Sequence, residues 1–179
     1  YKKPEETAKV FTEDGWFRTG DAGKLVDGKH LYMTDRLKDL FKTSNGKYIA
    51  PQQIETILGG DVFIEQVAVI GNNRNYVTAI IAPNIEAIKG YAEQNGIKYE
   101  YVDELMDNPQ ICKMMEERIA NLQKDMAPYE KIKKFRMIKR GFTIESGELT
   151  STLKLRRAVI LQNYAAMIEE MYNPVKGPL

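Results

Sequence analysis

Two apolar runs in the middle of the chain constrain its fold more than any other feature. VFIEQVAVIG (62–71) and YVTAIIAPN (76–84) are rich in β-branched residues, and only the polar loop from Asn72 to Asn75 separates them. Such runs predict strands, because β-branched side chains pack well on a pleated surface. A connection this short most simply joins neighbouring antiparallel strands, so we expect an antiparallel pair here.

Two short helices are expected on either side of this pair in the sequence. Pro51 suits the first turn of a helix, and the apolar residues that follow it extend the helix to about Leu58. EAIKGYAEQNG (86–96) also has a helical pattern, and Gly96 is a typical stop signal. The cluster SNG (44–46) marks a turn ahead of the first helix.

The second half of the chain is expected to be mostly helical. Apolar residues between 108 and 127 recur at spacings of four, four, three and four, which places them on one face of an amphipathic helix. KKFRMI (133–138) alternates as a strand does, GFTIESGELTSTLK (141–154) is loop-like, and LRRAVILQNYAAMIEEMY (155–172) has the period of a closing helix. We interpret the apolar face as core-facing rather than as a cofactor site; it consists of Ile111, Met115, Ile119, Leu122 and Met126.

The N-terminal part of the chain is predicted to be a small β-meander. Aromatic and β-branched residues in GWFRT (15–19), GKLV (23–26) and HLYMT (30–34) are separated by glycines and by the turn pair Asp27-Gly28. The fold class that we expect is therefore α+β, with this meander followed by strands and flanking helices.

Composition and charge argue against several classes of function. The 179 residues carry a formal net charge of +1, which gives no reason to expect a nucleic acid partner. The single cysteine, Cys112, and the single histidine, His30, leave no cluster for zinc, and we predict no metal site. No apolar run is long enough to span a bilayer, and a reducing, cytoplasmic setting is the default.

Three residues suit a nucleotide site. Asp21 ends GWFRTGD (15–21), where glycines allow close approach, and its carboxylate could accept hydrogen bonds from two ribose hydroxyls. Arg36 follows a predicted strand, and a guanidinium binds oxygens with fixed geometry. Lys154 lies in ELTSTLKLRR (148–157), where a flexible ammonium could stabilise developing negative charge. Taken alone, each has a commoner interpretation as a turn residue, a charged linker and a helix-start charge, respectively.

The order and spacing of these segments resemble the C-terminal motifs of the acyl-adenylate-forming enzymes, which include acyl-CoA synthetases, luciferases and peptide-synthetase adenylation domains. GWFRTGD (15–21), DRLKDLFKTSNGKYIAPQQIE (35–55) and LTSTLKLRR (149–157) carry the resemblance. Together with the similar stretches between them, it covers essentially the whole chain.

Two details resemble the long-chain fatty acid–CoA ligases within this superfamily. The segment between Arg36 and Gly46 is one residue longer than in most members, as is typical of that branch. Leu153 stands where the wider family usually has a glycine, in the form TLKLRR (152–157) that resembles long-chain ligases. This departure disfavours peptide synthetases and acetyl-CoA synthetases.

The resemblance implies roles for four residues in the first half-reaction and in domain movement. Asp21 would accept hydrogen bonds from the ribose, and Arg36 would bind the same nucleotide. Lys38 matches the hinge about which the small C-terminal domain rotates. Lys154 would be catalytic, stabilising negative charge between the fatty-acid carboxylate and the α-phosphate during adenylation.

The resemblance places the second half-reaction at the loop around Gly46. A glycine there would line the CoA channel, because a side chain would block the pantetheine arm. Lys42 matches a position that faces the active site in some relatives, although a surface role is equally compatible. Three further lysines could meet a CoA phosphate, but a short charge run usually marks a solvated face and we assign them no role: Lys131, Lys133 and Lys134.

The resemblance also implies a domain organisation. Residues 1–35 would be the end of the large N-terminal domain, 36–39 the hinge, 40–172 the mobile C-terminal domain and 173–179 a tail. The chain has no Ser/Thr/Gly-rich phosphate loop and no obvious adenine or fatty-acid pocket. We therefore expect it to be the C-terminal portion of a ligase, inactive alone, with the missing N-terminal domain as its partner.

The implied activity is that of an acid–thiol ligase. A fatty acid and ATP, with Mg²⁺, would give acyl-AMP and pyrophosphate, and CoA would then give acyl-CoA and AMP. ATP and CoA would be substrates of the full-length enzyme, with none bound to this part. The expected location is cytoplasmic, with peripheral contact at the inner membrane face left open. Alternatives are a medium-chain or aryl acyl-CoA ligase, and a stand-alone non-catalytic interaction module of the same fold.

Overall fold

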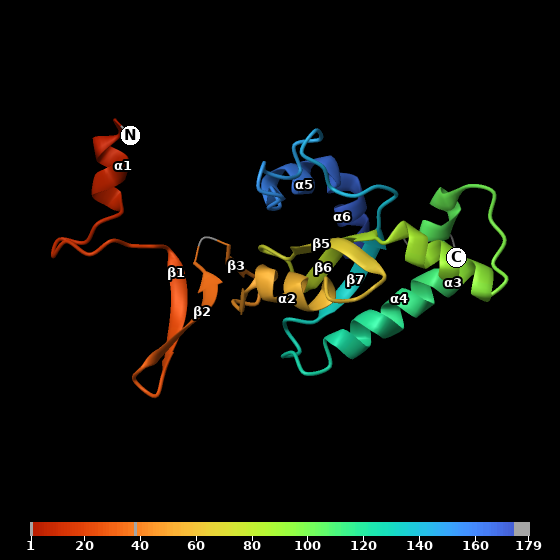
Figure 1. The fold of residues 1–179 in the computed structure, drawn as a ribbon, viewed down its shortest axis with the longest axis horizontal. Helices are drawn as coiled ribbons and strands as arrows, with labels where there is room; N and C mark the ends of the chain where they lie inside the picture. The colour runs from red at the N-terminus through yellow and green to blue at the C-terminus, as the bar shows by residue number, and fades with distance from the viewer. Residues whose placement is uncertain (1, 38, 174–179) are drawn as a thin grey trace. The chain divides into compact units, whose positions relative to one another are not determined.

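The chain consists of two compact units. The computed structural model describes residues 2–37 and 39–173, and for residues 34–36 it describes the backbone alone. Contacts divide the chain into Tyr1–Leu40 and Phe41–Leu179, which we name the N-terminal unit and the C-terminal unit (Figure 1). Lys38, the expected hinge residue, lies outside the described residues, and the expected domain boundaries remain predictions.

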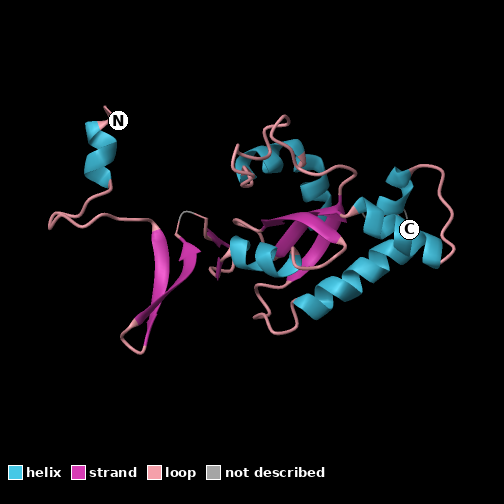
Figure 2. Cartoon of the chain, in the orientation of Figure 1, coloured by secondary structure: helices cyan, strands magenta, loops and turns pink. Residues whose placement is uncertain are grey.

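The described part of the N-terminal unit has a short helix and a β-hairpin (Figure 2). α1 (Pro4–Lys9) begins at a proline, whose fixed φ suits the first helical position. β1 (Asp21–Val26) and β2 (His30–Arg36) are antiparallel, and the turn between them contains Asp27 and Gly28 with φ angles of 54° and 65°. Asp-Gly pairs favour this left-handed turn, so the turn predicted there is confirmed.

The strand expected at GWFRT is reduced to an isolated bridge between Phe11 and Phe17. The chain reverses tightly here, because the Thr12 N–H donates to the Trp16 carbonyl at 2.8 Å and the Trp16 N–H donates to the Thr12 hydroxyl at 2.8 Å. Gly15 permits the reversal with a φ of 89°. The turn uses backbone groups that a longer ladder would need, and no regular strand forms at 15–19.

A three-stranded sheet is the centre of the C-terminal unit. β5 (Ile64–Ile70) and β6 (Val77–Pro83) are antiparallel, which confirms the pair predicted from the two apolar runs. β7 (Ile132–Met137) pairs with β6 in parallel, so the order is β5-β6-β7. All residues of the central strand β6 are buried, because both faces of the sheet are covered.

Helices cover the sheet on both sides (Figure 1). Val67 and Val69 of β5 belong to one hydrophobic cluster, and Ala68 and Ile70 belong to the other, as the period of two in a strand requires. This arrangement confirms the α+β class. The first cluster also contains residues of four helical elements: α2 (Pro51–Leu58), α3 (Ile85–Gln94), the 3-10 helix η1 (Val102–Met106) and α4 (Pro109–Leu122). The second contains residues of α5 (Arg157–Asn163) and α6 (Ala165–Tyr172).

Helix α4 ends earlier than its apolar pattern predicts. The helix stops at Leu122, although the pattern continues to Met126. The side chain of Gln123 bonds to the backbone of Ile132, which ties the end of the helix to the start of β7. Met126 still packs against the first hydrophobic cluster, so its apolar character reflects burial rather than helix.

The closing helix expected over 155–172 is two helices. The chain breaks at Tyr164, which has φ −110° and ψ 21° and separates α5 from α6. The Tyr164 ring packs edge-on against Phe142, with centroids 6.0 Å apart. Ile160 before the break and Ile168 after it both remain in the second cluster, which explains why the apolar period continues across it.

Candidate functional site

The hairpin of the N-terminal unit carries the expected nucleotide residues. Asp21 is the first residue of β1, and the strand register places it opposite Arg36, the last residue of β2. The Asp21 N–H donates to the Thr19 hydroxyl at 3.1 Å. Gly20, with a φ of 78°, accepts a hydrogen bond from the Leu37 N–H at 2.8 Å. The backbone therefore brings Asp21 and Arg36 together, while the side chain of Arg36 lies outside the description.

The expected CoA-channel residue Gly46 lies in the tight loop between β3 (Phe41–Lys42) and β4 (Tyr48–Ile49). Its φ is 79°, a left-handed conformation that glycine adopts without strain. The Gly46 N–H donates to the Thr43 carbonyl at 2.9 Å. Lys42 lies beside it: a Cβ on Gly46 would be 3.8 Å from Lys42 Cε, and the Lys42 ammonium is 5.6 Å from the centre of the Tyr48 ring.

The Gly46 loop is fixed against the loop between β5 and β6. The Ser44 N–H donates to the Arg74 carbonyl at 3.0 Å, and the Ser44 hydroxyl donates to Asn75 Oδ1 at 2.8 Å. Asn45 Nδ2 donates to the Asn75 carbonyl at 3.1 Å. These bonds join segments that are 30 residues apart in the sequence, so the Gly46 loop belongs to the folded body of the C-terminal unit.

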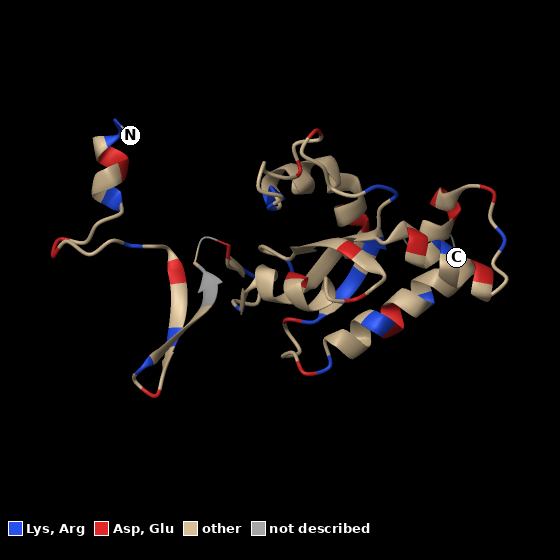
Figure 3. Cartoon of the chain, viewed as in Figure 1, with Lys and Arg blue, Asp and Glu red and all other residues tan. Residues whose placement is uncertain are grey.

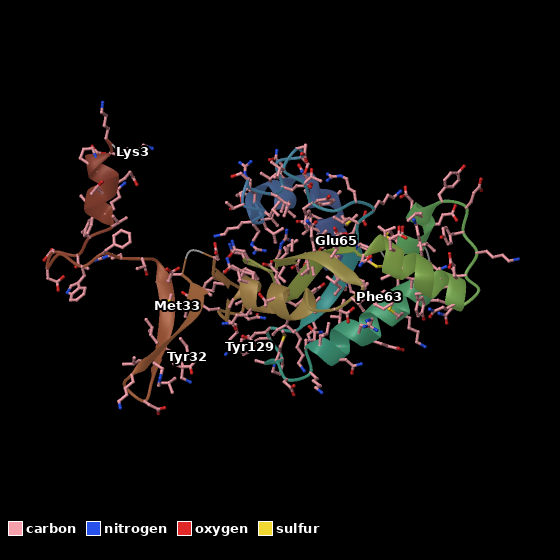
Figure 4. All side chains as sticks on the ribbon, viewed as in Figure 1. Lys3, Tyr32, Met33, Phe63, Glu65 and Tyr129 are labelled. Atoms are coloured by element: carbon pink, nitrogen blue, oxygen red, sulfur yellow. The ribbon has the colours of Figure 1, made fainter. Side chains whose placement is uncertain are left out.

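A small cationic cavity of about 230 Å³ adjoins this loop. The Lys47 ammonium lies 5.4 Å from the centre of the Tyr129 ring, which is labelled in Figure 4. Lys131 and Lys133 also line the cavity, so two of the three lysines that sequence analysis left unassigned gather beside the Gly46 loop. The remaining lining has polar and apolar parts and comes from Thr43, Asn45, Asn75, Tyr76 and Pro128.

Lys154 lies in a narrow hairpin that we name the lysine hairpin (148–156). At its base the Arg156 N–H donates to the Glu148 carbonyl at 2.7 Å. Nearer its tip, Thr150 and Lys154 are joined twice: the Thr150 N–H donates to the Lys154 carbonyl at 2.8 Å, and the Lys154 N–H donates to Thr150 Oγ1 at 3.1 Å. The Lys154 side chain is exposed. A long, flexible side chain therefore extends into solvent from a backbone that these hydrogen bonds hold in place.

Leu153 precedes the lysine in a left-handed conformation, with a φ of 59°. This conformation costs a leucine roughly 1–2 kcal/mol relative to the right-handed region. Its side chain is 69% exposed, so burial within the C-terminal unit does not offset the cost. A glycine would adopt the same φ freely, which gives a physical reason for the glycine that usually precedes the lysine in the wider family.

A buried carboxylate lies at the base of the lysine hairpin. Glu148 is fully buried, and both of its oxygens accept from Arg140, at 2.9 and 3.1 Å. Ser146 Oγ and Asn163 Nδ2 also donate to it, at 2.6 and 3.0 Å. Burial alone raises the pKa of a carboxyl group, but these hydrogen bonds and the Arg140 charge lower the pKa of Glu148 to about 2. Sequence analysis missed this residue, because nothing local distinguishes it from a surface glutamate.

A second ion pair follows the lysine hairpin. Arg157, the first residue of α5, donates to both oxygens of Glu55 in α2, at 2.7 and 3.1 Å. It also donates to the Val69 carbonyl at 2.8 Å, while the Val69 N–H donates to Glu55 at 2.8 Å. Arg157 thus ties the start of α5 to both α2 and β5.

The described part of the chain carries charged residues of both signs without a large region of either. Acidic and basic residues are interspersed along α4 and over much of the C-terminal unit, as Figure 3 shows. Within residues 2–37 and 39–173, no group of three or more potential metal ligands occurs. No helix in that same part of the chain has the length and apolar character needed to cross a membrane.

Comparison with known proteins places the chain beside long-chain acyl-CoA synthetases. It is 32% identical to peroxisomal long chain acyl-CoA synthetase 7 of Arabidopsis thaliana over 188 residues, covering 100% of this chain and 27% of that protein. It is 33% identical to human long-chain-fatty-acid–CoA ligase 1 over 178 residues, covering 98% of this chain and 25% of that protein. The chain therefore spans about a quarter of the length of these relatives.

Solved structures show the same fold. The adenylation domain of a carboxylate reductase from Mycobacterium chelonae matches with a TM-score of 0.79 and 31% identity, over 97% of this chain and 25% of that chain. The adenylation domain of a carboxylic acid reductase from Segniliparus rugosus, solved with AMP and a co-purified carboxylic acid, matches with a TM-score of 0.75 and 30% identity, over 98% and 26%.

A family match covers most of the chain and confirms the resemblance that the sequence motifs indicate. The match spans residues 38–176 and includes the Gly46 loop and the lysine hairpin. The chain belongs to the family of AMP-binding enzyme C-terminal domains.

Proposed function

We propose that the chain is the C-terminal portion of an AMP-forming long-chain fatty acid–CoA ligase, an acid–thiol ligase. The names of its relatives and the TLKLRR form of the lysine hairpin support this assignment. One observation carries it: Lys154 projects from a hairpin whose backbone is held by hydrogen bonds on both sides of the lysine. An exposed lysine on a fixed support suits charge stabilisation at a substrate presented by another part of the protein.

The first half-reaction joins the fatty acid to AMP. The fatty-acid carboxylate attacks the α-phosphate of ATP, which enters as its Mg²⁺ complex, and pyrophosphate leaves. Negative charge gathers between the carboxylate and the phosphate in the transition state, and the Lys154 ammonium would stabilise it there. Asp21 would accept hydrogen bonds from the ribose hydroxyls, and Arg36 would bind the same nucleotide.

The second half-reaction transfers the acyl group to CoA. The thiol attacks the acyl carbonyl carbon, the bond to the phosphate oxygen breaks, and AMP leaves. Gly46 would line the path of the pantetheine arm, with Lys42 beside it, because glycine leaves room and its loop is fixed to Asn75. The adjoining cavity would hold a phosphate of CoA, since Lys47, Lys131 and Lys133 all line it.

The N-terminal unit supports the proposal that the rest of the protein packs against it. Leu25, Leu31, Tyr32 and Met33 of the β1-β2 hairpin are each about 60% exposed. Figure 4 labels Tyr32 and Met33, whose side chains project from β2. Apolar side chains gathered on one hairpin are typical of a surface that is buried in a larger assembly. The large N-terminal domain would pack over these apolar side chains of the β1-β2 hairpin. Lys38 would be the hinge between that domain and the C-terminal unit.

The cellular setting remains part of the proposal. We assign the full-length enzyme to lipid metabolism and to the cytoplasm. We also propose that it contacts the inner face of the membrane peripherally. The fragment by itself would bind neither ATP nor CoA tightly, because most of the walls of both sites would come from the large domain.

The test is acyl-CoA formation by the full-length protein that contains this chain. We expect ATP- and CoA-dependent conversion of long-chain fatty acids, with lower kcat/KM for medium-chain and aryl acids. Preference for the shorter or aryl acids would instead support another adenylate-forming enzyme. Absence of adenylation with every acid would support a non-catalytic interaction module and contradict the proposal.

A second candidate concerns the thiol acceptor. The two adenylation domains described above, with TM-scores of 0.79 and 0.75, are parts of carboxylate reductases rather than of CoA ligases. If the acceptor were a carrier-protein thiol, adenylation of fatty acids would occur, but free CoA would yield no acyl-CoA. Measurement of both products in one assay separates the two acceptors.

A further inference from the structure

The lysine hairpin is held at both of its ends by buried or half-buried ion pairs. Glu148 begins the hairpin and pairs with Arg140, while Arg157 immediately follows it and pairs with Glu55. Between these two points the chain makes no other ion pair that the described residues show. The hairpin is held on the C-terminal unit by these two anchors, by burial of Leu149 in the second hydrophobic cluster, and by backbone hydrogen bonds, which include one from the Leu149 N–H to the Thr143 carbonyl at 3.0 Å.

The Glu148 anchor is the more deeply buried of the two. Its side chain is 0% exposed, whereas that of Glu55 is 13% exposed. Four hydrogen bonds reach its carboxylate, and they come from three residues in two segments: Arg140 and Ser146 lie in the loop after β7, and Asn163 ends α5. A fully satisfied buried network of this kind specifies one arrangement of its members, since any rearrangement leaves a donor or the charge unpaired.

The route from Glu148 to Lys154 is short. The Glu148 carbonyl accepts from the Arg156 N–H, the next pair along is the bridge between Leu149 and Leu155, and the pair after that is Thr150 and Lys154. Each pair fixes the next in register. Fixing the Glu148 side chain therefore fixes the Lys154 backbone, and the lysine retains only the freedom of its side-chain torsions.

We propose that Glu148 is a positioning residue for Lys154: its buried network with Arg140, Ser146 and Asn163 holds the base of the lysine hairpin rigid and so fixes the backbone from which Lys154 extends. This inference rests on the proposed function, because it assigns Lys154 to adenylation. Positioning matters for a reacting charge, since a displacement of about 1 Å can cost roughly 100-fold in rate.

The variant Glu148→Gln tests the anchor with little change in volume. Arg140 donates to both oxygens, so whichever oxygen becomes an amide nitrogen, one guanidinium donor faces another donor. Ser146 and Asn163 can reorient, but arginine has no acceptor. The variant therefore breaks the buried side-chain network at the base of the hairpin while Lys154 itself is unchanged.

In the full-length protein we expect Glu148→Gln to lower kcat of fatty-acid-dependent ATP–pyrophosphate exchange by about 10- to 100-fold. KM for ATP and for the fatty acid should stay within about twofold, because Glu148 contacts neither, and thioester formation from supplied acyl-AMP should be retained. Glu148→Asp, which keeps the charge, should recover part of the exchange rate. A loss of folded protein alone would lower both half-reactions equally and would overturn the positioning role.

The control is Glu169→Gln, which breaks a different arginine–glutamate pair. Glu169 lies on α6 and pairs with Arg74 in the β5-β6 loop, and neither residue belongs to the lysine hairpin or to the Glu148 network. Glu169→Gln should therefore leave exchange unchanged. Hydrogen exchange of the segment 149–155, followed by mass spectrometry of the full-length protein, should accelerate in Glu148→Gln and not in Glu169→Gln.

Two outcomes separate this inference from the proposed function. If wild-type protein adenylates fatty acids and Lys154→Ala abolishes exchange, but Glu148→Gln exchanges at the wild-type rate, the proposed function stands and the positioning role is wrong. If wild-type protein shows no fatty-acid-dependent exchange at all, the proposed function fails first. Unchanged hydrogen exchange at 149–155 in Glu148→Gln would also contradict the inference.

Discussion

The side-chain amide of Gln123 pairs with the backbone of Ile132 in both directions. Its Nε2 donates to the Ile132 carbonyl at 3.1 Å, and its Oε1 accepts from the Ile132 N–H at 2.8 Å. Gln123 is 7% exposed, so both bonds are shielded from water. The amide occupies the place that a neighbouring strand would take, because β6 lies on one side of β7 only.

Replacing this amide should destabilise the C-terminal unit. Gln123→Met keeps the length of the side chain but leaves a buried N–H and a buried carbonyl without partners, at a cost of about 2–4 kcal/mol. Gln94→Met, at the exposed end of α3, is the matched control and should change stability by less than about 0.5 kcal/mol. Urea denaturation of the two variants measures the difference, and equal stabilities would show that Gln123 contributes nothing specific.

The left-handed conformation of Leu153 predicts opposite effects for two substitutions. Leu153→Asn should stabilise the protein by about 0.5–1 kcal/mol, because asparagine tolerates a positive φ. Leu153→Val should destabilise it by about 1 kcal/mol, because β-branched residues avoid this region. Thermal unfolding checks both, and a valine variant more stable than the asparagine variant would contradict the assigned conformation.

The two glycines Gly46 and Gly90 should respond oppositely to alanine. Gly46 has a φ of 79°, so Gly46→Ala introduces strain of about 1 kcal/mol although the nearest atom would be 3.8 Å away. Gly90 lies within α3 with open space around it, and Gly90→Ala should stabilise the helix by about 0.5–1 kcal/mol. In the full-length enzyme, Gly46→Ala should also raise KM for CoA while leaving ATP–pyrophosphate exchange unchanged.

The cationic cavity predicts a charge-dependent effect on CoA. Lys47→Gln combined with Lys133→Gln removes two of its cations and should raise KM for CoA about tenfold, with a smaller effect at high salt. Lys113→Gln, on the exposed face of α4, serves as the control. An unchanged KM for CoA in the double variant would exclude the cavity as a phosphate site.

The pKa of Glu148 predicts that acid removes a specific part of the stability. The pKa is lowered from 4.5 to about 2 by folding, so the carboxylate stabilises the folded state above about pH 4.5 and loses this effect as the pH falls toward 2. The shift corresponds to on the order of 3 kcal/mol. The stability difference between wild type and Glu148→Gln should therefore shrink between pH 5 and pH 2.5 in urea denaturation, and a constant difference would contradict the lowered pKa.

Local patterns predicted the central elements but not the contacts that complete them. The apolar runs that form β5 and β6, and the proline that begins α2, act through neighbouring residues and were readable from the sequence. The end of α4 was not, because it depends on a bond from Gln123 to Ile132 nine residues away. Periodicity also cannot reveal a break such as Tyr164, since the residues on both of its sides remain buried on the same face.

The candidate site divides in the same way. Asp21, Arg36, Gly46 and Lys154 could be named as candidates because each lies in a short recognisable motif. The buried network of Glu148 is visible only in the tertiary structure, since its partners include Asn163 on a helix that follows the lysine hairpin. The cavity beside Gly46 likewise brings Lys47 together with residues more than 80 positions away.

The proposal that Lys154 acts in adenylation and not in thioester formation gives the most direct test of the whole account. Full-length wild type, Lys154→Ala and the exposed-surface control Lys98→Ala would be compared in two assays: fatty-acid-dependent ATP–pyrophosphate exchange, and acyl-CoA formation from supplied acyl-AMP. The account predicts that Lys154→Ala abolishes exchange and largely retains thioester formation, while Lys98→Ala retains both. Equal loss of the two half-reactions in Lys154→Ala, or exchange at the wild-type rate, would contradict it.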